Sequence, residues 1–250
     1  MSGWVSRRFW SEAAIGAAGA GFRVLLDGRA VRTPARNELI VPTRALAEAV
    51  RAEWAAVADR IDPRQMPHTR SANAAIDKVA PHFDDVAAMI AAYGETDLLC
   101  YRAEGPEELR ARQAEAWDPL LDWAARELGA RLVVTQGIVP VPQPAESLAR
   151  LGAAVFALSP FQLTALHDLV SLTGSLVLGL AATDRRFATG RLWELSRIDE
   201  AWQIAQWGED AEAAAAAAIK RAEFEHARNF WSLASCGMSE SCAPPPEAET

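Results

Sequence analysis

The side chains that most often act as catalytic bases, nucleophiles or metal ligands are scattered through this sequence. The four histidines are His68, His82, His167 and His226. Their spacing from one another and from the cysteines does not match that of a metal site. Cys100 follows two leucines, which is typical of a small buried hydrophobic residue. There is no glycine-rich phosphate loop and no nucleophile elbow. These patterns predict no catalytic residue, no metal site and no cofactor.

An enzyme nevertheless stays open as an alternative. Asp97 and Arg102 flank a hydrophobic segment, and with His68 or Glu200 they could serve a small-molecule site at a junction between two domains. The same two charges could simply anchor a buried segment. A tight pocket with convergent polar side chains and perturbed pKa values would favour the enzyme, and a broad, mixed surface would favour a protein-binding role. An inert structural subunit is a third class, and it predicts stable co-purification with a partner.

The composition predicts a folded, acidic protein. Half of the 250 residues are apolar, 23% are charged and the formal net charge is −8. No general field therefore attracts nucleic acid or anionic lipid. The three cysteines are an odd number without metal-ligand spacing, and the amino terminus lacks a signal-peptide or transit-peptide pattern. We expect a reducing, bacterial-type cytoplasm and no nucleic-acid partner.

One apolar run needs a membrane test. Residues 163–182 have the length of roughly 20 residues that a membrane-spanning helix needs. The run contains His167 and Asp168, and an aspartate inside a bilayer is costly. A buried helix at the centre of a bundle explains the same apolarity without that cost. We therefore expect no membrane insertion.

The elements that must position these residues divide into two kinds. Residues 22–42 alternate short β-compatible runs with turns, and Asp27-Gly28 predicts a tight hairpin. Thr43 then supplies a cap for a helix with one apolar stripe, which would cover the sheet. The sequence predicts an α+β protein: a small amino-terminal antiparallel β domain with a covering helix (residues 1–65), then an all-helical domain.

The helical domain is expected to span residues 66–235 and to be followed by a disordered tail, 236–250, which contains Cys236 and Cys242. Pro106 should open a strong helix that Pro119 kinks or splits. Four more helices are expected near residues 145–158, 161–182, 190–207 and 210–233. The pattern leaves open whether the segments near 98–101 and 131–137 are strand or helix.

The expected helix at 190–207 has two different faces. At about 100° per residue, Leu192, Leu195, Ile198, Trp202 and Ala205 share the apolar side. The opposite side gathers Ser196, Glu200, Gln203 and Trp207, with Trp193 and Ile204 along its border. A solvated face covered by the following helix would explain this pattern. Tryptophan on a polar face also indicates a protein-binding surface, because tryptophan is enriched at interface hot spots.

Eight short motifs follow one another between Arg7 and about residue 233. They are Arg8-Phe9-Trp10; Leu26-Asp27-Gly28-Arg29 with Thr33-Pro34; Glu53-Trp54; Met66-Pro67-His68-Thr69; Thr96-Asp97-Leu98-Leu99-Cys100-Tyr101-Arg102; Trp117-Asp118-Pro119; Ser196-Arg197 with Glu200; and Gln203 leading to Trp207-Gly208. In this order they resemble the assembly chaperones that act on the α subunit of the F-type ATP synthase catalytic sector. The alanine run after Gly208 and the cysteine-containing tail depart from the pattern.

The resemblance implies a chaperone rather than an enzyme. It would bind the unassembled α subunit without ATP, prevent aggregation of the hydrophobic surface which that subunit later buries, and hand it to the β subunit. The free protein is expected to be a monomer. The resemblance marks Glu200 as the functional acid, within a client-binding set of Glu200, Gln203, Trp207, Ser196 and Trp193. It marks a second set as structural or functional motif residues, namely Trp54, Asp97, Arg102, Trp117 and Asp118.

Overall fold

The computed structural model describes residues 7–235, and the predicted tail at 236–250 lies outside the described residues. By its contacts the chain forms two compact units. Among the described residues, the first contains residues 7–81 and 229–235, and the second contains residues 82–228. The expectation that the chain divides near residue 65 into separately folding domains stays a prediction.

The first unit contains an antiparallel sheet. The strands are β1 (Ala13–Ala18), β2 (Gly21–Leu26), β3 (Arg29–Ala30) and β4 (Ile40–Val41), and β2 pairs with each of the others. Asp27 and Gly28 have φ of 45° and 79°, which confirms the predicted Asp-Gly turn. Strand β1 was not predicted, because its alanines and glycine have low strand propensity, and its six-residue pairing with β2 decides its conformation.

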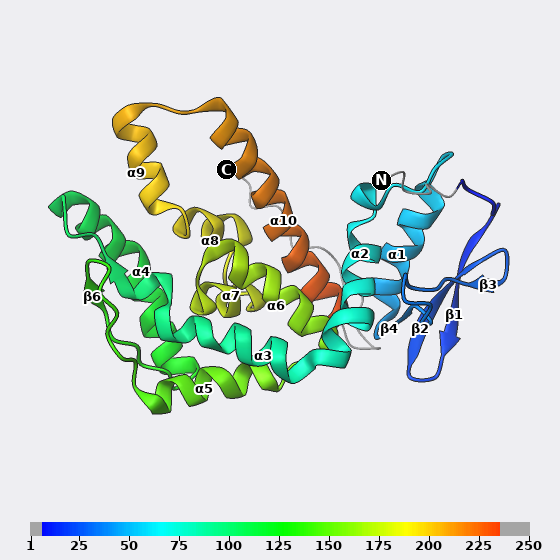
Figure 1. Cartoon of the computed structure of the whole chain (residues 1–250), viewed down its shortest axis with the longest axis horizontal. Helices are drawn as coiled ribbons and strands as arrows, with labels where there is room; N and C mark the ends of the chain where they lie inside the picture. The colour runs from blue at the N-terminus through cyan, green and yellow to red at the C-terminus, as the bar shows by residue number, and fades with distance from the viewer. Residues whose placement is uncertain (1–6, 236–250) are drawn as a thin grey trace. The chain divides into compact units, whose positions relative to one another are not determined.

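One helix, α1 (Arg44–Ala56), lies against this sheet (Figure 1). The Thr43 side chain accepts a hydrogen bond from the Leu46 backbone N–H, as predicted. Leu46 and Val50 are buried on its inner face. The chain continues through η1 (Pro63–Gln65), α2 (Pro67–Ala74), η2 (Ala75–Val79) and η3 (Ala80–His82). The predicted amino-terminal sheet with a covering helix is therefore confirmed.

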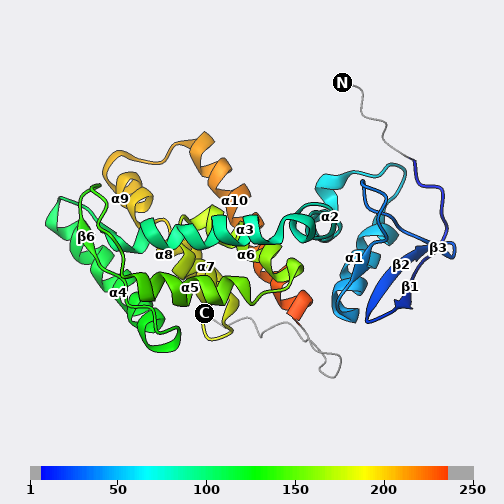
Figure 2. The same cartoon turned by 60° about the horizontal axis from the view of Figure 1, so that its bottom comes forward.

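The second unit is mostly helical. Its elements are α3 (Phe83–Ala91), η4 (Ala92–Thr96), η5 (Leu98–Cys100), β5 (Tyr101–Arg102), α4 (Glu107–Glu127), β6 (Thr135–Gln136), α5 (Ala145–Phe156), α6 (Pro160–Thr173), α7 (Leu176–Thr183), α8 (Thr189–Leu195), α9 (Ile198–Trp207) and the greater part of α10 (Ala211–Ser235). Helix α3 runs alongside α5 and α6 in both views (Figures 1 and 2). Of the two segments left open by the sequence, the first is the 3-10 helix η5 followed by β5, which starts at Tyr101, and the second contains β6. Strands β5 and β6 form a short parallel pair.

Two expected helices are each broken in two. The apolar run at 163–182 divides because Gly174 ends α6 in a left-handed conformation, φ 71°, and the Ser175 side chain caps α7. Every residue from Leu176 to Ala182 is buried. None of the helices described between residues 7 and 235 has the length and apolarity to cross a membrane. The second break, at Ser196–Arg197, shapes the site described next. Helix α4, by contrast, continues through Pro119 without splitting.

Candidate interaction surface

The break between α8 and α9 is made by a tryptophan from a distant helix. The Trp117 ring nitrogen, on α4, donates to the Leu195 carbonyl at 2.8 Å. That carbonyl lies in the last turn of α8, where carbonyls have no partner within the helix. Arg197 then leaves helical geometry with φ −122°, and α9 begins at Ile198. The expected single helix at 190–207 is therefore wrong, since no local proline or glycine signals this tertiary contact.

A glutamine on α4 holds the start of α9. The Gln113 side chain is buried, and its amide nitrogen donates to the Asp199 carboxylate at 2.6 Å. Its amide oxygen accepts from the Ala103 backbone N–H at 2.8 Å. Buried amides with both ends satisfied fix the orientation of the elements they join. Gln113 therefore ties the residue after β5 to the first turn of α9.

The predicted motif residues of this unit lie beneath that junction. The buried Arg102 guanidinium donates to the Leu99 carbonyl and, at 2.6 Å, to the Asp118 carboxylate. It also lies 5.1 Å from the centre of the Trp117 ring. The structure thus brings Arg102, Trp117 and Asp118 together. Their polar groups are engaged in holding α4 and the segment before it.

Asp97 has a similar anchoring position. Its buried carboxylate accepts from the Leu99 backbone N–H, the Ser175 hydroxyl and the Val177 backbone N–H, so it joins η5 to the start of α7. Burial raises the pKa of Asp97 despite these three donors. Burial likewise raises the pKa of Cys100 to about 12, with a smaller contribution from Asp97, so this thiol stays protonated at neutral pH.

Trp54 belongs to the other unit and lies on α1. Its ring is half-buried and meets the Trp10 ring edge-on, with 5.3 Å between the ring centres. The Trp10 ring nitrogen donates to the Trp54 carbonyl at 3.3 Å. Trp54 therefore packs within the amino-terminal strand-helix unit.

The outer face of α9, defined here as Glu200, Gln203, Ile204 and Trp207, is exposed. The Trp207 ring is 80% exposed and Ile204 is 41% exposed. At about 100° per residue these four side chains span about 100° of the helix surface. The Glu200 carboxylate has one exposed ion pair, at 3.5 Å to Arg197. Gly208 ends the helix with φ 88°, a conformation that other residues adopt with strain.

Two residues of the predicted client-binding set lie elsewhere. Trp193 is 5% exposed, and its ring packs 5.7 Å from the centre of the Phe224 ring and 5.5 Å from the Arg197 guanidinium. The Ser196 hydroxyl donates to the Trp193 carbonyl at 2.7 Å. Because the helix breaks here, residues of α8 do not continue the face of α9. Ala205, expected in the core, is exposed instead.

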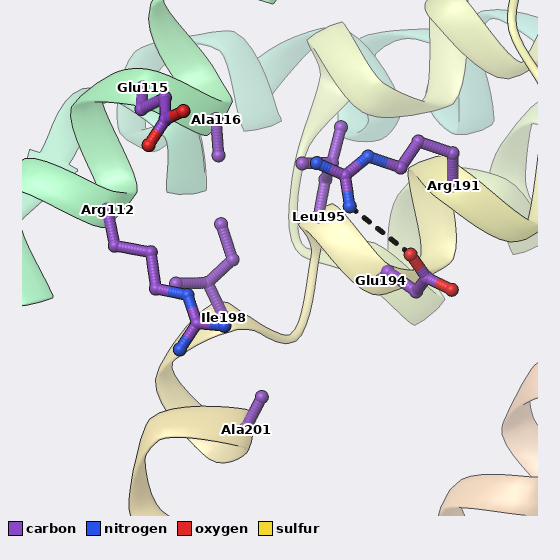
Figure 3. Close-up of a pocket in the computed structure, with 8 residues that line it drawn as sticks. All are labelled: Arg112, Glu115, Ala116, Arg191, Glu194, Leu195, Ile198 and Ala201. Carbon is purple, nitrogen blue, oxygen red and sulfur yellow. Dashed lines mark hydrogen bonds and ion pairs between the residues drawn. The ribbon is translucent and has the colours of Figure 1, made fainter.

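A hollow next to α9 was not predicted. It has a volume of about 450 Å³ and is bordered by α4, α8 and α9 (Figure 3). Arg112 lies on the α4 side and Arg191 on the α8 side, while Leu195, Ile198 and Ala201 line it with apolar atoms. Sequence periodicity could not find this site, because its residues come from three elements that only tertiary packing brings together.

A second exposed apolar segment was also missed. Residues 133–139 contain four exposed aliphatic side chains, Val133, Val134, Ile138 and Val139. Strand β6 is part of this segment. Within residues 7–235, no cluster of histidine, cysteine, aspartate and glutamate could hold a metal ion.

Comparison with known proteins agrees with the order of motifs. The family model described as ATP12 chaperone protein matches residues 7–125. A curated relative, the mitochondrial protein atp12 of Schizosaccharomyces pombe, is 25% identical over 219 residues, which cover 82% of this chain and 75% of that protein.

Solved structures from Paracoccus denitrificans match the whole fold. The crystal structure of its Atp12 has a TM-score of 0.89 and 54% identity, and the match covers 91% of this chain and 98% of that one. A point mutant of the same protein has a TM-score of 0.90 and 53% identity, covering 93% of this chain and 100% of that one. The chain therefore belongs to the ATP12 family, whose members are chaperones of ATP synthase assembly and not enzymes.

Proposed function

We propose that this protein binds the unassembled α subunit of the ATP synthase catalytic sector and that the outer face of α9 is part of the binding surface. The observation that carries the proposal is the Trp207 ring, 80% exposed beside Ile204 and Glu200 on one helix. A large exposed aromatic beside an aliphatic and a charged group has the composition of an interface centre. Buried anchors at Trp117 and Gln113 support this helix at its start.

A mixed surface suits a temporary partner. Subunit surface that is destined for an interface is apolar, and it aggregates while it is exposed. The chaperone must compete with that aggregation and still yield to the β subunit, so its affinity must lie below that of the final contact. Ion pairs and exposed aromatics can be released when a larger interface replaces them. The chain contains no phosphate loop, and we propose that neither capture nor release needs ATP.

The partner and the ATP-independent cycle of capture and release can be tested together. Tagged chaperone is mixed separately with the α, β and γ subunits in the absence of nucleotide, and bound protein is recovered. We expect capture of α alone, suppression of α aggregation measured by light scattering, and release of the chaperone when β is added. Recovery of none of the three subunits would reject the proposal, and a strict need for ATP would reject the cycle.

The oligomeric state and the cellular compartment are also part of the proposal. We propose that the protein acts as a monomer in a bacterial-type cytoplasm. Sedimentation of the free chaperone checks the first point, because a dimer would double the mass. Cell fractionation followed by immunoblotting checks the second.

A further inference from the structure

The hollow beside α9 has features that the client-binding proposal does not use. Leu195 and Ile198 are buried at its apolar base, and Ala201 is exposed at its edge. Ile198, Ala201 and Ala205 recur at the three- and four-residue spacing of one helix face, over two turns. The apolar strip of α9 thus runs beyond the hollow. A small molecule seated in the hollow would leave the rest of the strip exposed, whereas a helix laid along it would cover both.

Arg112 supplies a cation that the fold leaves unused. Its side chain is exposed, and between residues 7 and 235 no carboxylate lies within ion-pair distance of it. Figure 3 shows its guanidinium extending from α4 toward Ile198. Glu115 is one turn further along α4, and its carboxylate does not pair with the Arg112 guanidinium. A guanidinium beside an apolar surface is suited to a carboxylate, which it can bind through two parallel hydrogen bonds.

A second arginine approaches from the other side. Arg191 on α8 pairs with Glu194 at 3.3 Å, and both side chains are more than half exposed. Exposed pairs of this kind contribute little stability, so Arg191 can exchange Glu194 for an incoming carboxylate at small cost. The net charge of the chain is −8, so its general field repels acidic partners. Recognition of an acidic group here therefore depends on these two arginines.

We infer that the hollow receives an amphipathic helix of the client, with an aliphatic side chain on Leu195 and Ile198 and a neighbouring aspartate or glutamate on Arg112. This inference rests on the proposed function and specifies the client segment which that function would recognise. Helix-in-groove binding of this kind uses apolar anchors at helical spacing, while the charged contact fixes register and partner choice.

The test is charge reversal at Arg112 with a matched control. Arg112→Glu and Arg131→Glu change the net charge equally, and Arg131 is an exposed residue outside the hollow. We expect Arg112→Glu to raise the Kd for the α subunit at least tenfold and to remove most of its salt dependence. Arg131→Glu should change the Kd less than twofold. Both variants should keep the wild-type circular dichroism and unfolding midpoint, because neither side chain has a described partner.

The segment itself is identified by crosslinking. The photoreactive residue p-benzoylphenylalanine is placed at Ala205, which continues the apolar strip outside the hollow. We expect a crosslink to an α-subunit helix that carries an aspartate or glutamate within one turn of an aliphatic residue. A crosslinked segment without an acidic residue, or equal Kd values for the Arg112 and Arg131 variants, would overturn the inference while wild-type binding to α upheld the proposed function. Absence of wild-type binding to α would overturn both.

Discussion

Two places in the chain each present a glutamate and a tryptophan, and they are built in opposite ways. On α1, the Glu53 carboxylate accepts four hydrogen bonds, from the backbone N–H groups of His68 and Thr69, the His68 ring and the Thr69 hydroxyl. On α9, the Glu200 carboxylate has one exposed ion pair. Trp54 packs against Trp10, whereas Trp207 meets solvent. The glutamate and tryptophan of α1 stabilise the fold, whereas those of α9 remain available to a partner.

The reason lies in what each helix must satisfy. Glu53 satisfies backbone N–H groups at the start of α2, which have no partner within their own helix. Replacing one carboxylate oxygen with an amide NH2 group would leave the donors to that oxygen without an acceptor. Between residues 7 and 235, no backbone N–H group donates to the Glu200 carboxylate. Substitutions of Glu53 and Trp54 on α1 should therefore change stability, and substitutions of Glu200 and Trp207 on α9 should change binding.

The largest expected effect separates the two tryptophans. Trp54→Ala should lower the free energy of unfolding by about 3 kcal/mol, because a half-buried ring and its contact with Trp10 are lost. Trp207→Ala should change stability by less than about 0.5 kcal/mol and weaken α-subunit binding by about 3 kcal/mol, as for an interface hot spot. Urea unfolding and calorimetric titration measure the two quantities.

Phe156→Ala is the control for the tryptophan pair, since Phe156 is an exposed aromatic on α5. It should leave both quantities unchanged. A binding loss at Phe156 equal to that at Trp207 would mean that exposed aromatics act without regard to position, and the comparison would fail.

The contribution of Glu53 on α1 to stability should depend on pH. Burial raises the pKa of Glu53, but the hydrogen bonds from His68 and Thr69 outweigh it, and the pKa lies below its ordinary value of 4.5. A lowered folded-state pKa contributes stability above the unfolded pKa, and this stability is lost as pH falls through the folded one. Glu53→Gln should therefore cost about 2 kcal/mol at pH 7. The difference from wild type should shrink as pH falls below about 4.5, as measured by urea unfolding at each pH.

A cost for Glu53→Gln that stayed constant from pH 7 to pH 3 would show that the substitution acts through packing and not through the charge.

A small effect on stability and a moderate effect on binding are expected at Glu200. Glu200→Gln keeps size and helix propensity, so unfolding should change by less than about 0.5 kcal/mol. Binding to the α subunit should weaken by about 2 kcal/mol if the carboxylate meets a client cation in a partly desolvated contact. Thermal unfolding and suppression of α aggregation are measured on the same preparation.

Glu225→Gln is a close match for Glu200→Gln. The Glu225 side chain is 49% exposed and pairs with Arg221 on α10, while that of Glu200 is 48% exposed and pairs with Arg197. Equal binding losses in the two variants would indicate a general charge effect. Loss of both folding and binding at Glu200 would instead identify a structural acid.

Local chemistry made much of the fold predictable. The Asp27-Gly28 turn, the Thr43 cap and the apolar stripe of α1 each follow from residues within one element, because turn geometry, capping and helical periodicity are short-range. The common face of Glu200, Gln203 and Trp207 follows in the same way from helical spacing, whereas its exposure depends on the position of the following helix. Strand β1 did not follow, because its pairing partner, and not its own composition, holds it extended.

The amino-acid order by itself determined the family, the α+β class and the common face of Glu200, Gln203 and Trp207, since these depend on motif order and on periodicity within single elements. Only the tertiary structure decided where the helix at 190–207 breaks, because the Leu195 carbonyl is satisfied by Trp117, 78 residues away. The same contact separates buried Trp193 from exposed Trp207. It also lies beside the hollow that brings Arg112 and Arg191 to one place, and long-range hydrogen bonds of this kind leave no local pattern in the sequence.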